Sequence, residues 1–275
     1  MINNKFPPII YGTAWKEEKT EALVTKALNA GFRGIDTANQ RRHYYEEAVG
    51  KAISKAINNN TINRKDLFIQ TKFTYIQGQD HRLPYDHNAN FQTQLSQSFE
   101  SSLKHLQIDY IDSYILHGPQ TGNGLTDADW IVWKEMESIY KKGEAKYLGI
   151  SNVNLDQLKE LFTRAEIKPT FVQNRCYASS GWDMQIRKFC KENNIVYQGF
   201  SLLTANPDIF YNQKLRELVL KSGKTPAQVI FRFAMQVGMI PLTGTTNETH
   251  MKEDLSCINF SLSDEDVRFI ENIVL

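Results

Sequence analysis

The sequence has few cysteines, almost no net charge and no long apolar run. Its three cysteines, Cys176, Cys190 and Cys257, are scattered and odd in number, which is typical of free thiols in a reducing compartment. No Cys-x-x-Cys pair indicates zinc or a redox dithiol, and we expect no metal site. The 32 basic and 31 acidic residues leave a formal net charge of +1, which favours neither nucleic acid nor an anionic membrane as a partner.

The sequence also lacks the segments that direct a chain to a membrane or out of the cell. No apolar stretch approaches the ~20 residues of a membrane span. Residues 1–5 lead directly into an expected strand rather than resembling a signal peptide. We therefore expect a cytoplasmic, monomeric protein that acts on a small molecule.

Short apolar strands alternate with amphipathic helices along the chain. The expected strands are 9–14, 32–38, 66–73, 110–117, 147–151, 170–175, 195–201 and 239–243. The expected helices are 20–30, 46–57, 91–106, 130–140, 155–165, 184–192 and 225–236, a short one near His250, and a terminal one over 263–275.

This alternation predicts an α/β fold in which parallel strands are joined by right-handed crossovers. The first strand-to-helix turn, residues 12–16, lacks the Gly-x-Gly-x-x-Gly fingerprint that an open doubly wound sheet uses to bind a dinucleotide. Eight strand–helix units in 275 residues fit a closed barrel, which typically needs roughly 250 residues. We expect one (β/α)8 TIM-barrel domain over residues 1–275, with a C-terminal helix.

Polar residues end several of the expected strands, where the chemistry of a barrel lies. Asp36, Lys72 and His117 end the second, third and fourth strands, and Ser151-Asn152 end the fifth. Singly, each has a structural explanation, such as a helix cap, a solvated lysine or a core histidine. Together, a carboxylate holds the lysine charged, and a charged lysine lowers the pKa of a neighbouring phenol. This arrangement needs a tyrosine to act as an acid.

Six segments of the sequence resemble the signatures of the aldo-keto reductases, in that family's order. They are GFRGIDTA (31–38), EEAVGKAI (46–53), LFIQTK (67–72), DYIDSYILH (109–117), LGISN (148–152) and KPTFVQ (168–173). The resemblance extends along nearly the whole chain. It implies an enzyme of the alcohol dehydrogenase (NADP+) kind that reduces aldehydes or ketones, with hydride from NAD(P)H and a proton from a tyrosine.

The same resemblance implies roles for the residues at the strand ends. Asp36 and Lys72 tune the tyrosine, and His117 orients the carbonyl group and assists proton transfer. The family usually places the tyrosine five residues after the aspartate, where this sequence has Arg41. The acid is then Tyr44 or Tyr45, and we favour Tyr44 because some members carry a similar His-Tyr pair in a lengthened turn.

The resemblance also implies a cofactor site at the strand ends. Ser151, Asn152 and Gln173 match the residues that hydrogen-bond the nicotinamide carboxamide, and Phe200 matches the aromatic residue that stacks on the ring. The residues expected beside the pyrophosphate are Ser201 and Leu203, with Gly12, Thr13 and Asp36 approaching the same region.

The sequence departs from the family where the adenosine end of the cofactor binds. Leu242 follows the proline of the last strand, where the family has a lysine, and His250 lies near the place of an arginine. The groups expected to hold a phosphate there are the hydroxyls and amides of Thr243, Thr245 and Thr246. Glu253 and Asp254 match adenine contacts, although a solvated helix face explains them equally well. We expect NADPH as the cofactor, with NADH as the alternative.

Variable loops form the substrate pocket in this family. The residues expected to contact a small carbonyl substrate are Trp15, Tyr44, Tyr75, His117 and Gly118, together with the loop 80–90. Gly118 stands where many relatives have tryptophan, which opens the pocket.

Two other functions compete with carbonyl reduction. A barrel that binds the cofactor without turnover would act as a sensor or auxiliary subunit. An aldolase would use Lys72 as a Schiff-base nucleophile, but this alternative leaves Ser151, Asn152 and Gln173 unexplained.

Overall fold

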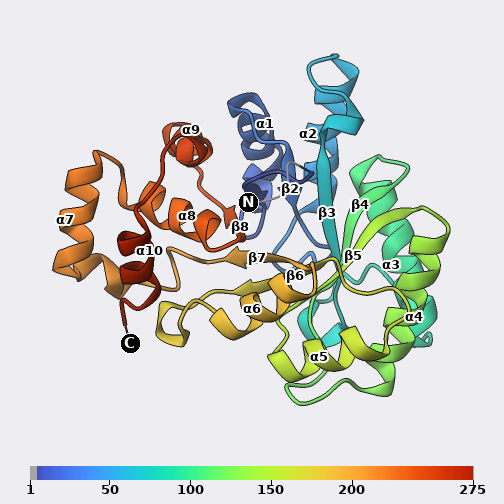
Figure 1. Ribbon diagram of the computed structural model, residues 1–275. Coiled ribbons are helices and arrows are strands. Elements are labelled where there is room, and N and C mark those ends of the chain that lie inside the picture. The colour runs from blue at the N-terminus through green and yellow to red at the C-terminus, as the bar shows by residue number, and fades with distance from the viewer. Residues whose placement is uncertain (1–4, 275) are drawn as a thin grey trace.

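The computed structural model describes residues 5–274, which form a closed barrel of eight parallel strands, with neighbours in sequence order (Figure 1). The strands are β1 (Ile10–Gly12), β2 (Gly34–Asp36), β3 (Phe68–Phe73), β4 (Ile111–Leu116), β5 (Ala145–Ser151), β6 (Phe171–Arg175), β7 (Val196–Phe200) and β8 (Met239–Thr243). Closure between β1 and β8 pairs Ile10 with Leu242 and Tyr11 with Thr243. The predicted (β/α)8 fold is confirmed.

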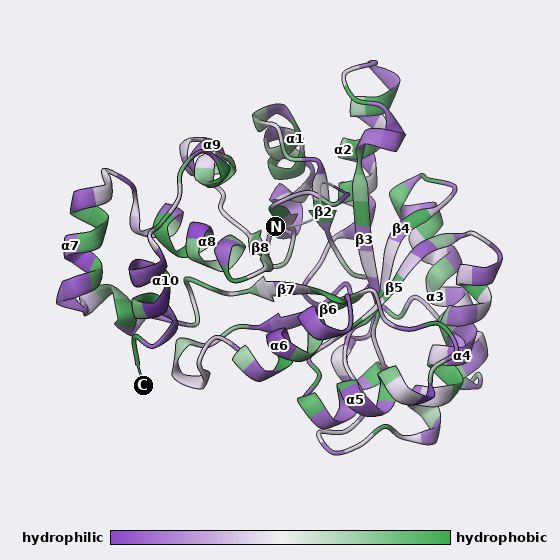
Figure 2. Cartoon of the chain, viewed as in Figure 1, coloured by the Kyte–Doolittle hydropathy of each residue, from purple (hydrophilic) through white to green (hydrophobic). Residues whose placement is uncertain are grey.

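Helices surround the barrel and connect its strands. They are α1 (Thr20–Ala30), α2 (Glu46–Asn58), α3 (Phe91–Leu106), α4 (Asp127–Lys141), α5 (Leu155–Arg164), α6 (Met184–Glu192), α7 (Gln213–Ser222), α8 (Pro226–Gln236), α9 (Glu248–Leu255) and α10 (Asp264–Glu271). Figure 2 shows them striped in green and purple, as expected of helices that bury one face against the strands. Among residues 5–274, no helix combines the length and the apolar character needed to cross a membrane.

The structure differs from the sequence-based expectation at two helices. Helix α7 was not predicted; among its residues only Leu215 is buried. Helix α10 is shorter than the predicted 263–275, and Ser263 and Asp266 form a capping box at its start. The expectations for residues 1–4 and for Leu275 lie outside the described residues.

The barrel interior becomes more polar from the amino to the carboxyl ends of the strands. Alternate side chains of β3 face inward, so the inner series is Phe68, Gln70 and Lys72. At the amino end, Phe6 packs edge-on against Phe68 and Phe171, with ring centroids 5.9 and 4.9 Å apart. Apolar side chains therefore seal one end of the barrel, and charged and amide side chains occupy the other.

Candidate active site

A cavity of about 1250 Å³ opens at the carboxyl ends of the strands. Its wall includes residues of the loops that follow β1, β2, β3 and β4, and residues of β6, β7, β8, α8 and α9. Pockets for drug-sized ligands are usually about 300–1,000 Å³. The cavity therefore has room for a ligand as long as a dinucleotide together with a small substrate.

A buried ion pair lies beneath the cavity. Lys72 Nζ is 2.7 Å from both carboxylate oxygens of Asp36 and 2.8 Å from the carbonyl oxygen of Thr37. Burial lowers the pKa of Lys72, and the charge of Asp36 opposes that shift. All three ammonium hydrogens have an acceptor, and Lys72 is fully buried behind the cavity wall. This arrangement disfavours a free amine that attacks a substrate as an aldolase requires.

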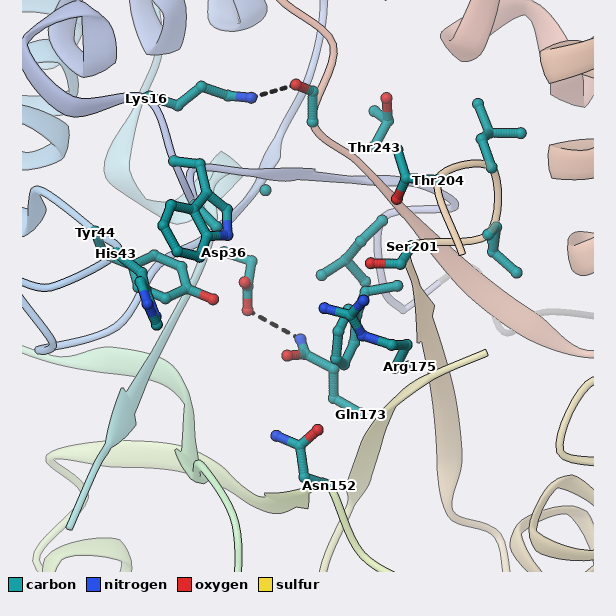
Figure 3. Close-up of a pocket in the computed structure, with 18 of the residues that line it drawn as sticks. Lys16, Asp36, His43, Tyr44, Asn152, Gln173, Arg175, Ser201, Thr204 and Thr243 are labelled. Atoms are coloured by element: carbon teal, nitrogen blue, oxygen red, sulfur yellow. Dashed lines mark hydrogen bonds between the residues drawn. The ribbon is translucent and has the colours of Figure 1, made fainter. Parts of the chain in front are cut away.

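Tyr44 occupies the corner of the cavity next to this ion pair. Its ring centroid is 5.1 Å from Lys72 Nζ and 6.0 Å from the ring of His117. In Figure 3 the phenol points into the cavity on the side of Asp36. Burial raises the pKa of Tyr44, and the charge of Asp36 adds to this. The sequence analysis expected Lys72 to lower the pKa of this phenol, but desolvation dominates and raises it. The raised pKa keeps the phenol protonated at neutral pH.

Tyr45, the other candidate acid, lies away from this corner. Its ring stacks against Arg41, with the guanidinium carbon 3.9 Å from the ring centroid, and it precedes the first residue of α2. It is not part of the cavity wall. The structure thus brings Tyr44, and not Tyr45, to Lys72 and His117.

His117 completes the corner as a neutral imidazole. Its Nδ1 is 2.7 Å from the hydroxyl of Thr74, and its Nε2 makes no hydrogen bond to the described residues. Burial lowers the pKa of His117 well below its usual range, and the nearby Lys72 charge adds to this. A neutral ring with one nitrogen anchored can present the other to a ligand in the cavity.

The residues expected at the nicotinamide, together with Thr13 from the expected pyrophosphate region, fall into two groups. Gln173, Asn152 and Phe200 line the cavity. Ser151 and Thr13 are buried behind it and use their hydroxyls within the protein: Ser151 Oγ donates to the carbonyl of Gln173 at 2.6 Å, and Thr13 Oγ1 to that of Asp36 at 2.9 Å. Ser151 and Thr13 do not line the cavity, and their direct contact with a cofactor stays a prediction.

The adenosine end of the proposed site lies over β8 and α9. The residues expected there that line the cavity are Thr243, Thr245, His250, Glu253 and Asp254, whereas Thr246 is exposed and outside it. Ser201 and Leu203, expected beside the pyrophosphate, also line the cavity. Asp254 is buried and accepts a hydrogen bond of 2.7 Å from Thr243 Oγ1. Burial raises the pKa of Asp254 to about 6.

Some cavity residues were missed by the sequence analysis. Lys16 donates from Nζ to the carbonyl of Gly244, which brings a cation to the phosphate end of the cavity (Figure 3). Arg175 lies over Phe200, with its guanidinium carbon 5.5 Å from the ring centroid. Strand alternation was a usable signal for Arg175, which lies two residues after Gln173. Lys16 had no local signal, because only barrel closure brings its loop to β8.

The expected substrate residues lie around the mouth of the cavity. Trp15 is 70% exposed, has a left-handed backbone (φ 62°) and stacks on His43, with ring centroids 4.0 Å apart. Tyr75 lines the wall, with its hydroxyl donating to Asp129 at 2.9 Å. Gly118 lines the cavity, and a Cβ there would make an ordinary van der Waals contact with Asn152, at 3.5 Å. The loop 80–90 does not line the cavity.

The donor set suits an organic cofactor. Amide and aromatic groups lie at one end of the cavity, and Lys16 with threonine hydroxyls at the other. Residues 5–274 contain no group of three or more His, Cys, Asp or Glu side chains placed to bind a metal ion. The residues present fit a nicotinamide dinucleotide laid along the cavity.

Comparison with known proteins agrees with this geometry. The family model "Aldo/keto reductase family" matches residues 8–206 and 208–274. Glyoxal reductase of Bacillus subtilis is 31% identical over 92% of this chain and 83% of its own length, and Protein REDOX 2 of Catharanthus roseus is 30% identical over 98% and 86%. The crystal structure of a Bombyx mori aldo-keto reductase in complex with NADP superposes with a TM-score of 0.82, at 25% identity, over 98% of this chain and 90% of that one. The chain therefore belongs to the aldo/keto reductase family of oxidoreductases.

Proposed function

We propose that the 275-residue chain is a single-domain, NADPH-dependent reductase that converts aldehydes or ketones to alcohols. The observation that carries this proposal is the corner where a protonated phenol, Tyr44, lies between the Asp36–Lys72 ion pair and a neutral His117. Gln173, Asn152 and Phe200 line the same cavity. A proton donor and a place for a nicotinamide ring therefore share one wall.

In this proposal the protein supplies the proton and the orientation of the substrate. His117 donates a hydrogen bond from Nε2 to the substrate carbonyl oxygen, since its Nδ1 is engaged by Thr74. Tyr44 gives its phenolic proton to that oxygen as charge develops on it, and the Lys72 ammonium stabilises the phenolate left behind. The bound cofactor supplies the hydride for the carbonyl carbon. In the reverse direction Tyr44 accepts the proton of an alcohol.

The preference for NADPH over NADH is supported by Lys16. Its ammonium, the hydroxyls of Thr243 and Thr245, and the imidazole of His250 are the groups on this wall that can meet a phosphate. The solved relative named with NADP agrees with this cofactor. The buried carboxylate of Asp254 repels the extra phosphate of NADPH. A preference for NADPH over NADH therefore requires that the attraction of Lys16 for that phosphate exceed the repulsion from Asp254.

Small carbonyl compounds are the substrates that we propose first. Gly118, which follows His117, adds no side chain to the cavity wall, and the Trp15–His43 pair lines the same cavity. One relative is named a glyoxal reductase, which makes short dicarbonyl compounds a reasonable starting panel.

The test is the loss of NADPH absorbance with glyoxal, methylglyoxal and a benzaldehyde, in wild type and Tyr44→Phe. We expect turnover in wild type and a loss of several powers of ten in the variant. Tight NADPH binding without turnover of any carbonyl would favour the sensor or auxiliary subunit instead. Activity that survives in Tyr44→Phe would remove Tyr44 from the mechanism.

A further inference from the structure

A layer of amide side chains crosses the middle of the barrel beneath the cavity. Gln70 on β3, Gln173 on β6 and Gln198 on β7 are each at most 3% exposed. Gln70 Nε2 donates to Gln198 Oε1 at 2.8 Å, and Gln198 Nε2 donates back to Gln70 Oε1 at 3.0 Å. Gln173 Nε2 also donates to Gln198 Oε1, at 3.0 Å. The three side chains thus form one connected network across the barrel.

Asp36 anchors this network at one end. Gln70 Nε2 and Gln173 Nε2 donate to its Oδ1 at 2.7 and 3.0 Å, beside the bonds from Lys72. A carboxylate paired with an ammonium only accepts hydrogen bonds, so Gln70 and Gln173 must turn their NH2 groups toward it. Both hydrogens of each NH2 group are then used, one on Asp36 and one on Gln198.

The direction of every remaining bond follows from this anchor. Because the NH2 group of Gln70 points toward Asp36, the Gln70 oxygen faces Gln198. Gln198 must therefore donate from its own NH2 group to that oxygen. The oxygen of Gln198 then faces the NH2 groups of Gln70 and Gln173. The Gln173 oxygen has no donor among the described residues, and Gln173 lines the cavity. Figure 3 shows the Gln173 amide with its nitrogen bonded to Asp36.

We propose that Gln70 and Gln198 are positioning residues that fix the Gln173 amide with its oxygen toward the cavity, where it accepts a hydrogen bond from the cofactor carboxamide. The inference rests on the proposed function for the identity of that ligand. Without Gln70, the Gln198 amide is free to turn, and its NH2 group would then meet the NH2 group of Gln173. The Gln173 NH2 group would then keep only its bond to Asp36, so its amide would be held less firmly, although neither Gln70 nor Gln198 lines the cavity.

The variants Gln70→Met and Gln198→Met remove the amides and keep the side-chain length. We expect each to weaken NADPH binding, measured by fluorescence titration, roughly tenfold, as for the loss of one well-placed hydrogen bond. Adenosine 2′,5′-bisphosphate, which has no nicotinamide, should bind within about twofold of wild type. Gln157→Met is the matched control, because Gln157 is equally buried and hydrogen-bonded but lies outside the cavity wall.

A cofactor analogue separates positioning from a general structural defect. The reduced 3-acetylpyridine analogue of NADPH has a methyl ketone in place of the carboxamide and cannot donate to Gln173. Gln70→Met should leave its affinity unchanged, and the effect on NADPH should vanish in a Gln173→Met background. Equal losses for NADPH, the analogue and the bisphosphate would overturn the proposal.

The network is also testable without any cofactor. In protein labelled with 15N-glutamine, the side-chain NH2 of Gln173, assigned by its loss in Gln173→Met, should exchange slowly with solvent. Gln70→Met should make that exchange at least tenfold faster. If wild type binds no nicotinamide dinucleotide, the proposed function fails while this measurement still decides the positioning. An exchange rate unaffected by Gln70→Met would refute it.

Discussion

The two ends of the cavity are built differently. At the end that holds Tyr44, the charged and polar groups come largely from strands and are buried, and the ion pair and three glutamines fix one another's orientation. At the adenosine end, the groups come mostly from the β1–α1 loop, the β8–α9 loop and α9, and they include a buried carboxyl group, Asp254, whose pKa is raised by burial. The ion pair and the glutamine layer are thus held by barrel strands, whereas the groups at the adenosine end come mostly from loops, which can vary.

The first prediction concerns Lys72, the buried cation at the end of the cavity that holds Tyr44. Lys72→Met should abolish turnover and also cost about 3–5 kcal/mol of stability, because it leaves Asp36 buried without its counter-charge. The sequence predicted only that the variant would lose the effect of Lys72 on the tyrosine pKa. The buried ion pair seen in the structure predicts a loss of stability as well. Steady-state kinetics and urea unfolding measure the two effects.

The double variant Asp36→Asn with Lys72→Met is the control for Lys72→Met. Removing both charges should restore most of the stability and none of the activity. Recovered activity in this neutral pair would mean that the ion pair is only structural.

The second prediction concerns the proton donor itself. Tyr44→Phe should lower kcat by roughly 10²–10⁴-fold, since among residues 5–274 the Tyr44 ring is the one phenol ring paired with that of His117. NADPH affinity should change little, because the phenol is not among the groups proposed to hold the cofactor. Tyr45→Phe is the matched control and should retain wild-type kcat, because its ring stacks on Arg41. The reverse outcome for this pair would move the acid by one residue.

The third prediction tests the buried carboxyl group of Asp254 at the adenosine end. Because burial raises the pKa of Asp254 to about 6, keeping it ionised in the folded protein costs free energy above that pH. Asp254→Asn should therefore raise the free energy of unfolding by about 2 kcal/mol at pH 7.5. The gain should shrink as the pH falls below about 6, where the native carboxyl is already protonated.

Urea unfolding of Asp254→Asn at pH 7.5 and 4.5 checks this sign. The half-exposed Glu253 on the same helix gives the control Glu253→Gln, expected to stay within about 0.5 kcal/mol of wild type. A variant that is less stable than wild type at pH 7.5 would show that the carboxylate is favourably placed.

The smallest expected effect is at Lys16. Lys16→Met should weaken NADPH binding roughly tenfold, or about 1.4 kcal/mol, and NADH binding less than twofold, if the ammonium meets the extra phosphate. Fluorescence titration with both cofactors makes the comparison. An equal loss for the two would assign Lys16 to the shared pyrophosphate, and no loss for either would remove it from the site.

The residues at the strand ends show how much of the candidate site could be predicted from the sequence. Asp36, Lys72 and His117 were predicted as neighbours because each follows or ends an apolar strand, and parallel strands of a barrel end on one rim. Lys72 is nevertheless buried behind that rim rather than lining the cavity. The choice between Tyr44 and Tyr45 was left to a resemblance, since both lie in the irregular turn before α2.

The sequence by itself determined the barrel, because strand and helix periods and the turn residues between them are local properties that each segment carries. Strand alternation places Gln70 on the same face of β3 as Lys72, but it does not determine that Gln70, Gln173 and Gln198 face the interior of the barrel. Only the tertiary structure decided that these glutamines meet across the barrel, that Lys16 reaches Gly244, and that Tyr44 faces Lys72. Those contacts depend on barrel closure, which pairs β1 with β8 and brings side chains of non-adjacent strands into contact across the interior. No local sequence pattern encodes the distance between those strands.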